Sequence, residues 1–134
     1  MIVVDTNVIG CLYLPAGHSP QAEQALRKDP LWAAPLLWRS ELRNVLALHM
    51  RKGLLSLPNA QRIMEAALRR MQGREYEATS DRILAFAASS TCSAYDCEFV
   101  ALAQDLNIPL VTVDRQILSQ FPDLALPLAE FVGG

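Results

Sequence analysis

Acidic side chains that end apolar runs are the residues of this chain best suited to chemistry. The β-branched run over residues 1–4 stops at Asp5, and the run over 110–113 stops at Asp114. Apolar runs of this kind are typical of buried parallel strands, and ligands bind outside the carboxyl ends of such strands. Both acids are therefore expected at one edge of a parallel sheet. The alternative for Asp5 alone is a helix cap, because Asp, Thr and Asn are common N-caps.

Two further acids carry local signals of their own. Asp96 lies in the first turn of a helix predicted over 94–106, where the backbone dipole favours a negative charge. Glu41 lies near the apolar stripe of a helix predicted over 37–51, and a carboxylate there is costly to bury unless it is paired or binds a cation. The alternative is an exposed Glu41 at the edge of that stripe. The convergence of four acids favours a shared site.

Four carboxylates a few ångströms apart repel one another and take up protons unless a cation is present. Oxygen ligands without His or Cys suit Mg²⁺ or Mn²⁺, and one or two such ions are expected. These ions meet phosphate oxygens and activate water for in-line displacement, so the pattern predicts phosphoryl chemistry. Short polar side chains are predicted to orient the carboxylates: Thr6, Asn7, Ser93 and Thr112.

Strand and helix signals alternate along the chain, and these elements must position the acids. The predicted strands cover 1–4, 31–34, 76–79 and 110–113, followed by an extended segment over 126–131. The predicted helices cover 21–28, 37–51, 59–71, 81–88, 94–106 and 115–121, and Asn107 is predicted as a left-handed C-cap. The pattern predicts a three-layer α/β/α fold around a doubly wound, mainly parallel sheet of four to five strands.

Composition limits the classes of protein to consider. A chain of 134 residues, 51% of them hydrophobic, predicts one globular domain over 1–134. The net charge of −2 lacks the basic excess of nucleic-acid binders, so binding of that kind requires a metal or a local basic patch. We expect no membrane span and no signal peptide. The odd number and spacing of Cys11, Cys92 and Cys97 predict buried thiols in a reducing cytoplasm.

Four short motifs follow one another along the chain: Asp5-Thr6-Asn7, Ser40-Glu41-Leu42, Ser93-Ala94-Tyr95-Asp96 and Thr112-Val113-Asp114. Each is weak alone, but the four in this order and spacing closely resemble the PIN domain. The similarity is closest to the short VapC-type toxins and covers essentially the whole chain. It implies a metal-dependent endoribonuclease that works as a homodimer and is often inhibited by a cognate antitoxin protein.

The resemblance also implies a role for each matching residue. Asp5 and Asp96 would be the principal metal ligands, and Asp114 would complete or extend the metal site. Glu41 would bind the metal or orient its water. Thr6, Asn7 and Thr112 would support these acids. The chain departs from the family at Asp96-Cys97-Glu98-Phe99, where small residues and an aromatic residue are more frequent, and Glu98 is assigned to the surface.

Few basic or aromatic side chains that could bind RNA lie near these motifs. Arg43 and Arg115 are the candidates for phosphate contacts. Arg51-Lys52 is assigned to a solvated helix end, whose dipole favours cations. Tyr95 could stack on a base, whereas the two tryptophans are expected in the core or in a dimer interface.

Other functions remain open at this stage. One alternative is a stand-alone PIN nuclease of RNA processing, and another is a catalytically silent PIN-like binding module. A receiver-type phosphorylation domain would need an acidic pair after the first strand and a lysine after the last, and both are missing. A haloacid-type phosphatase would need a second Asp where this chain has Asn7.

Overall fold

A parallel sheet forms the centre of the computed structural model, which describes residues 1–133. Its strands are β1 (Ile2–Val4), β2 (Trp32–Pro35), β3 (Glu75–Tyr76), β4 (Leu110–Thr112) and β5 (Ala125–Pro127). They lie in the order β3-β2-β1-β4-β5, and every neighbouring pair is parallel. The predicted parallel sheet is therefore confirmed, with β1 at its centre and β4 directly beside it.

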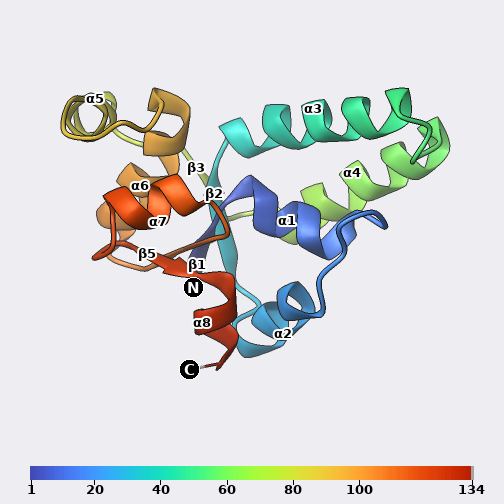
Figure 1. Cartoon of the computed structure of the whole chain (residues 1–134), viewed down its shortest axis with the longest axis horizontal. Helices are drawn as coiled ribbons and strands as arrows, with labels where there is room; N and C mark the ends of the chain where they lie inside the picture. Colours follow the sequence, from blue (N-terminus) through green and yellow to red (C-terminus); the bar gives the residue numbers. More distant parts are fainter. Residues whose placement is uncertain (134) are drawn as a thin grey trace.

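Helices cover both faces of this sheet (Figure 1). They are α1 (Thr6–Tyr13), α2 (Pro20–Lys28), α3 (Leu37–Arg51), α4 (Leu57–Met71), α5 (Ser80–Ala88), α6 (Ala94–Leu106), α7 (Arg115–Gln120) and α8 (Leu128–Gly133). Helix α6 packs on one face, with α5 outside it, while α1, α3 and α4 lie on the other side. The predicted three-layer α/β/α arrangement is confirmed.

Helix boundaries follow local capping chemistry. The hydroxyl of Ser19 accepts a hydrogen bond from the Gln21 N–H at the start of α2, next to Pro20, and a serine cap with proline in the first turn is a strong start signal. Helix α6 ends at Asn107, whose φ of 55° is left-handed. The predicted Asn C-cap is confirmed, because asparagine tolerates this conformation better than most residues.

Helix α6 is the core helix of the domain. Six of its residues are buried: Cys97, Phe99, Val100, Ala101, Leu102 and Ala103. The helix contacts β1, β2 and β4 on one side and α5 on the other, which explains why it is apolar around most of its circumference. Asp96, in the first turn, is therefore carried by a helix that is buried between the sheet and α5.

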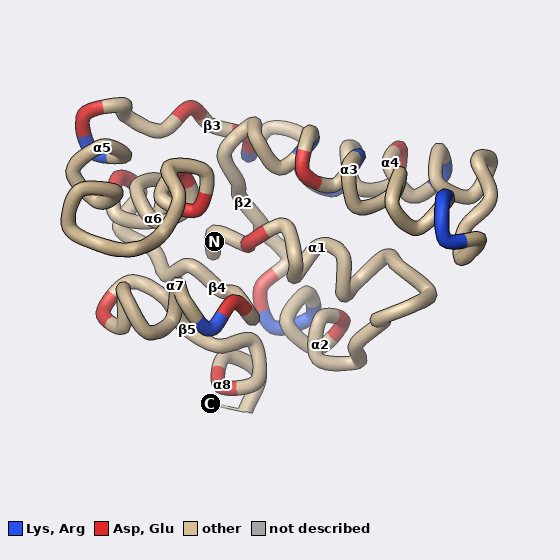
Figure 2. The backbone as a smooth tube through the Cα atoms, turned by 45° about the horizontal axis from the view of Figure 1, so that its top comes forward, with Lys and Arg blue, Asp and Glu red and all other residues tan. Residues whose placement is uncertain are grey.

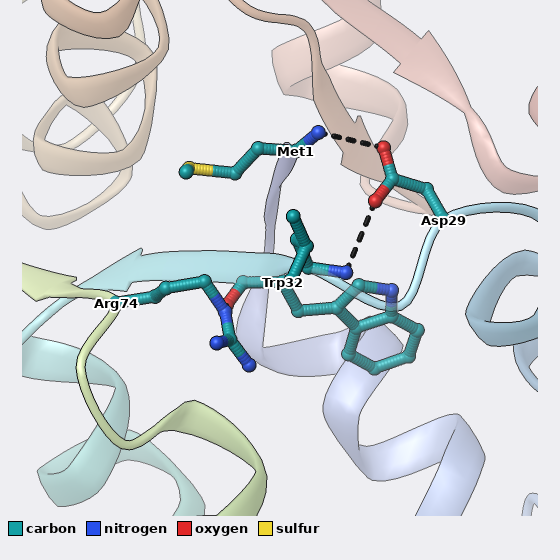
Figure 3. A network of polar contacts seen from close by, with 5 residues as sticks. Met1, Asp29, Trp32 and Arg74 are labelled. Atoms are coloured by element: carbon teal, nitrogen blue, oxygen red, sulfur yellow. Dashed lines mark hydrogen bonds and ion pairs between the residues drawn. The ribbon is translucent and has the colours of Figure 1, made fainter.

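The ends of the strands opposite the acids are tied together by polar contacts (Figure 3). The amino group of Met1 donates to Asp29 Oδ2 at 2.8 Å, and the N–H of Leu31 donates to Asp29 Oδ1 at 3.0 Å. Arg74 donates from Nε to the carbonyl of Trp32 at 2.9 Å. These contacts join the beginnings of β1 and β2 to the turn that leads into β3.

The short edge strand β3 is joined to α3 by one carboxylate. Glu75 accepts hydrogen bonds from Trp38 Nε1 at 2.8 Å and from Arg39 Nη2 at 2.6 Å. The Arg39 guanidinium holds the pKa of Glu75 below its usual value. The first turns of α3, which carry Glu41, are thereby anchored to the sheet.

Several predicted boundaries are wrong. The extended segment expected over 126–131 ends at Pro127, because Leu128 to Gly133 form α8, which packs against α2. The strand expected over 76–79 is only Glu75–Tyr76. Cys92 and Cys97 are buried as predicted, but Cys11 is half-exposed. Within residues 1–133, no helix has both the length and the apolar composition needed to cross a bilayer.

Candidate functional site

Asp5 lies where β1 ends, and only 7% of its surface is exposed. It occupies the N-cap position of α1, and its Oδ1 accepts from the Thr6 N–H at 2.8 Å. Its Oδ2 accepts from the Thr112 hydroxyl at 2.7 Å and from Asn7 Nδ2 at 3.3 Å. The simple capping role is present, but the carboxylate is also held by side chains from two elements.

Burial raises the pKa of Asp5 to about 6, against the opposing effect of the hydrogen bonds from Thr112 and Thr6. Glu41 and Asp96 raise it further by charge repulsion. A carboxylate in this state gains stability from a proton or from a cation, since either one removes its uncompensated charge.

Asp114 lies two residues after the end of β4 and caps α7. Its Oδ1 accepts from the N–H groups of Gln116 at 2.8 Å and Ile117 at 3.0 Å. The Asp114 N–H donates to the Thr112 hydroxyl at 3.0 Å. In the part of the chain that the structure describes, Asp114 Oδ2 receives no hydrogen bond, so this oxygen can turn toward the acids.

Glu41 reaches the same edge from α3. Its Oε1 accepts from the Thr6 hydroxyl at 2.7 Å. Burial raises the pKa of Glu41, and the negative charges of Asp96 and Glu98 raise it further. The predicted neighbourhood of Glu41 and the strand ends is confirmed by this contact across 35 residues of sequence.

Asp96 completes the cluster from the first turn of α6. Its N–H donates to the hydroxyl of the N-cap Ser93 at 3.1 Å. Burial raises the pKa of Asp96, and the nearby Asp114 adds to that rise. Each of Asp5, Glu41 and Asp96 therefore has a pKa raised in part by the charge of another acid at this edge: Glu41 and Asp96 act on Asp5, Asp96 acts on Glu41, and Asp114 acts on Asp96.

The chemistry of these donors fits a hard divalent cation, because all four are carboxylates. Among residues 1–133, no three such groups already have the spacing of a metal site. In this arrangement Glu41 Oε1 accepts from the Thr6 hydroxyl, and Asp114 Oδ1 accepts from the first turn of α7. The metal-ligand set stays a prediction.

Two predicted positions differ from expectation. Glu98 is only half-exposed and raises the pKa of Glu41, so its assignment to the surface alone is wrong. The apolar residues on both sides of Glu98 in the sequence of α6 could have indicated that this position is partly buried. Arg43 lies two residues from Glu41, which places it about 200° away around α3. It is exposed on a different flank of the helix and does not support a phosphate at the acids.

The remaining predicted residues have simple placements. Arg115 is exposed next to Asp114, and Tyr95 is 64% exposed next to Asp96. Trp32 and Trp38 are fully buried, so both belong to the core. Tyr95 is therefore an aromatic side chain beside Asp96 that is exposed to solvent.

Comparisons with known proteins agree with this geometry. The family model described as PIN domain matches residues 2–124. The chain is 32% identical over 129 residues to Ribonuclease VapC3 of Pyrobaculum aerophilum, and the match covers 94% of this chain and 98% of that protein.

Solved structures share the fold. The crystal structure of PAE2754 from Pyrobaculum aerophilum has a TM-score of 0.79 and 20% identity, covering 98% of this chain and 93% of that one. A toxin–antitoxin complex from Klebsiella pneumoniae contains a chain with a TM-score of 0.70 and 20% identity, covering 97% and 99%. The matches in sequence and fold extend over nearly the whole length, and the chain belongs to the PIN-domain family.

Proposed function

We propose that this protein is a metal-dependent endoribonuclease that hydrolyses RNA phosphodiester bonds as the toxin of a toxin–antitoxin pair. The observation that carries the proposal is the gathering of four carboxylates from separate segments of the chain, with the buried Asp5 among them. The similarity to a protein named a ribonuclease supports the substrate. The fold shared with a chain of a toxin–antitoxin complex supports the biological setting.

The chain's own groups divide the work in this proposal. Asp5, Asp96 and Asp114 would hold one or two Mg²⁺ or Mn²⁺ ions. Such ions neutralise the charge of carboxylates and phosphate and activate water for in-line attack. Glu41 has one oxygen fixed by the Thr6 hydroxyl, so its other oxygen is free to orient the attacking water and to accept its proton.

Polar neighbours keep the acids in place. Thr112 donates to Asp5 and accepts from the Asp114 N–H, which links the ends of β1 and β4. Asn7 donates to Asp5 as well. Contacts of this kind orient ligands and raise metal affinity, so these residues act as positioning residues in the proposed reaction.

The proposal includes partners and a compartment. We propose a homodimer that is inhibited by a cognate antitoxin protein, as the fold shared with a chain of a toxin–antitoxin complex suggests. Free thiols at Cys11, Cys92 and Cys97 suit a reducing compartment such as the cytoplasm. If the protein is a toxin, expression alone should arrest growth, and the product of a small adjacent gene should relieve the arrest. A stand-alone nuclease would need no such partner.

The direct test is RNA cleavage by the purified protein with Mg²⁺ or Mn²⁺ and with a chelator. We expect cleavage only with metal, and losses on the order of 10³-fold or more for Asp5→Asn and Asp96→Asn, because each removes charge from the ion site. Asp123→Asn is the matched control, since Asp123 is exposed and lies between α7 and β5. A folded wild type that binds RNA but never cuts it would instead identify a silent binding module.

A further inference from the structure

Positive charge is concentrated on one part of the molecule. Residues 37–71, which form α3, α4 and the turn between them (the α3–α4 hairpin), contain seven Lys or Arg and two Asp or Glu, a net charge of +5. The rest of the chain contains five Lys or Arg and twelve Asp or Glu, a net charge of −7. Figure 2 shows basic positions along the hairpin up to its tip, and mostly acidic positions on the body.

The hairpin cations are not used for internal ion pairs. Six of the seven are exposed: Arg43, Arg51, Lys52, Arg62, Arg69 and Arg70. Within residues 1–133, none of these six lies within 4.0 Å of a carboxylate oxygen, while Arg39 pairs with Glu75. Since internal pairs do not offset their charge, they remain available to an external anion.

Helix α4 arranges part of this charge as a stripe. Arg62 and Arg69 are seven residues apart, which places them on one side of the helix about 10 Å from each other. Beside them, a hollow of about 370 Å³ is lined by Tyr13, Ala66, Arg69 and Arg70. Arg70 Nε donates to the Tyr13 hydroxyl at 3.4 Å. A phosphate in this hollow would therefore lie between the side chains of Arg69 and Arg70.

We propose that the α3–α4 hairpin holds the phosphate backbone of single-stranded RNA. The proposal rests on the proposed function for the identity of the nucleic acid. The body and its acid cluster repel a polyanion, so affinity must come from another surface. Glu41 lies in the second turn of the hairpin's first helix, so an RNA strand that enters the acid cluster can continue along the hairpin. Arginine suits this role because its planar fork of donors matches phosphate.

The distribution of the cations favours RNA over a protein partner. Arg43 lies on one flank of α3, while Arg62 and Arg69 lie on the exposed face of α4. A flexible RNA strand with a phosphate charge on every nucleotide can contact several sides of a projecting hairpin at once. The centres of protein–protein interfaces are instead depleted of charged residues.

The test measures binding of a fluorescein-labelled single-stranded RNA of about 20 nucleotides, long enough to span several contacts. Fluorescence anisotropy is followed in chelator, which prevents metal-dependent cleavage, over a range of salt concentrations. For Arg62→Gln/Arg69→Gln, we expect the slope of log K against log salt to fall by about 1.4, which is on the order of 25-fold weaker binding at about 0.1 M salt.

The matched control is Arg27→Glu, which changes the net charge by the same two units. Arg27 is exposed on α2, away from the hairpin, and this variant should bind RNA with nearly wild-type affinity. Equal losses in the control and the double variant would overturn the proposal, because net charge alone would then explain binding. The proposal would also be overturned if the folded double variant kept the wild-type slope of log K against log salt. It would equally be overturned if sedimentation showed a changed oligomeric state while RNA binding stayed the same.

The outcome is separable from that of the proposed function. If the wild type binds RNA through the hairpin but cuts no RNA with metal, the hairpin proposal stands and the nuclease proposal fails. If the double variant cuts and binds RNA like the wild type, the nuclease proposal stands and the hairpin proposal fails.

Discussion

Strands β1 and β4 lie side by side and both end in an aspartate, yet the two carboxylates are held in different ways. Asp5 is buried, and three donors from two elements bind it. Asp114 is half-exposed, and one of its oxygens caps α7. An apolar run followed by an aspartate therefore gives a buried carboxylate with a raised pKa in one case and a half-exposed carboxylate in the other, although both cap a helix.

The difference comes from the position of each strand and from its neighbours. Beyond β1, Asp5 lies between the Thr112 hydroxyl and two further acids, so burial and repulsion act together on it. Asp114 follows β4, whose outer neighbour is the edge strand β5, and it is half-exposed. The comparison indicates that Asp5 is the fixed point of the site and that Asp114 is the adjustable one.

The largest expected contrast is in stability against pH without metal. The pKa of Asp5 is raised from 3.8 to about 6, so the folded state binds this proton more tightly than the unfolded state. The resulting stabilisation is complete below the unfolded pKa and is lost as the pH rises through the folded one, a change of about 3 kcal/mol.

Urea unfolding in chelator from about pH 3 to pH 8 would measure this loss. The wild type should lose about 3 kcal/mol relative to Asp5→Asn across this range. Addition of Mg²⁺ above pH 6 should restore stability if the ion binds here. If the unfolding free energies of the wild type and Asp5→Asn depended on pH in the same way, the pKa of Asp5 would not be raised in the folded state.

A smaller contrast concerns the hydroxyl that links the two strand ends. Thr112→Val keeps the shape of the side chain but removes the donor to Asp5 and the acceptor of the Asp114 N–H. We expect the Mn²⁺ affinity, measured by calorimetry, to fall on the order of 10- to 100-fold. Thr112→Ser keeps the hydroxyl and should bind Mn²⁺ nearly as the wild type does; equal affinities in all three proteins would rule out the positioning role.

The smallest contrast isolates the capping role of Asp114. Asp114→Ala removes the acceptor of the Gln116 and Ile117 N–H groups and should cost about 1 kcal/mol of unfolding free energy. Asp114→Ser keeps a capping oxygen without the charge and should cost less, while both variants should lose RNA cleavage. If serine destabilises as much as alanine in urea unfolding, the capping contribution has been overstated.

Features with a short-range cause could be predicted from the sequence. The ends of β1 and β4 follow from apolar runs that meet an acid, and the start and end of α6 follow from Ser93 and Asn107. These residues determine backbone conformation within a few positions of themselves. The order of the strands then brings the acids together, as the alternating pattern predicted.

Features that depend on packing between distant segments could not be predicted. The sequence predicted that Glu41 lies near the strand ends, but not that the Thr6 hydroxyl holds it, because this hydrogen bond depends on how α1 packs against α3. The region after Pro127 was expected to be extended, because its helix is stabilised by packing against α2.

The buried circumference of α6 has a consequence for the stability of the site against partial unfolding. Backbone amides of an element packed on both sides exchange with solvent only when most of the domain opens, whereas weakly buried elements open at lower free energy. Helix α5 has no buried residue, so its amides should exchange first and those of α6 last. Because α6 carries Asp96 in its first turn, local opening elsewhere would leave that acid in place.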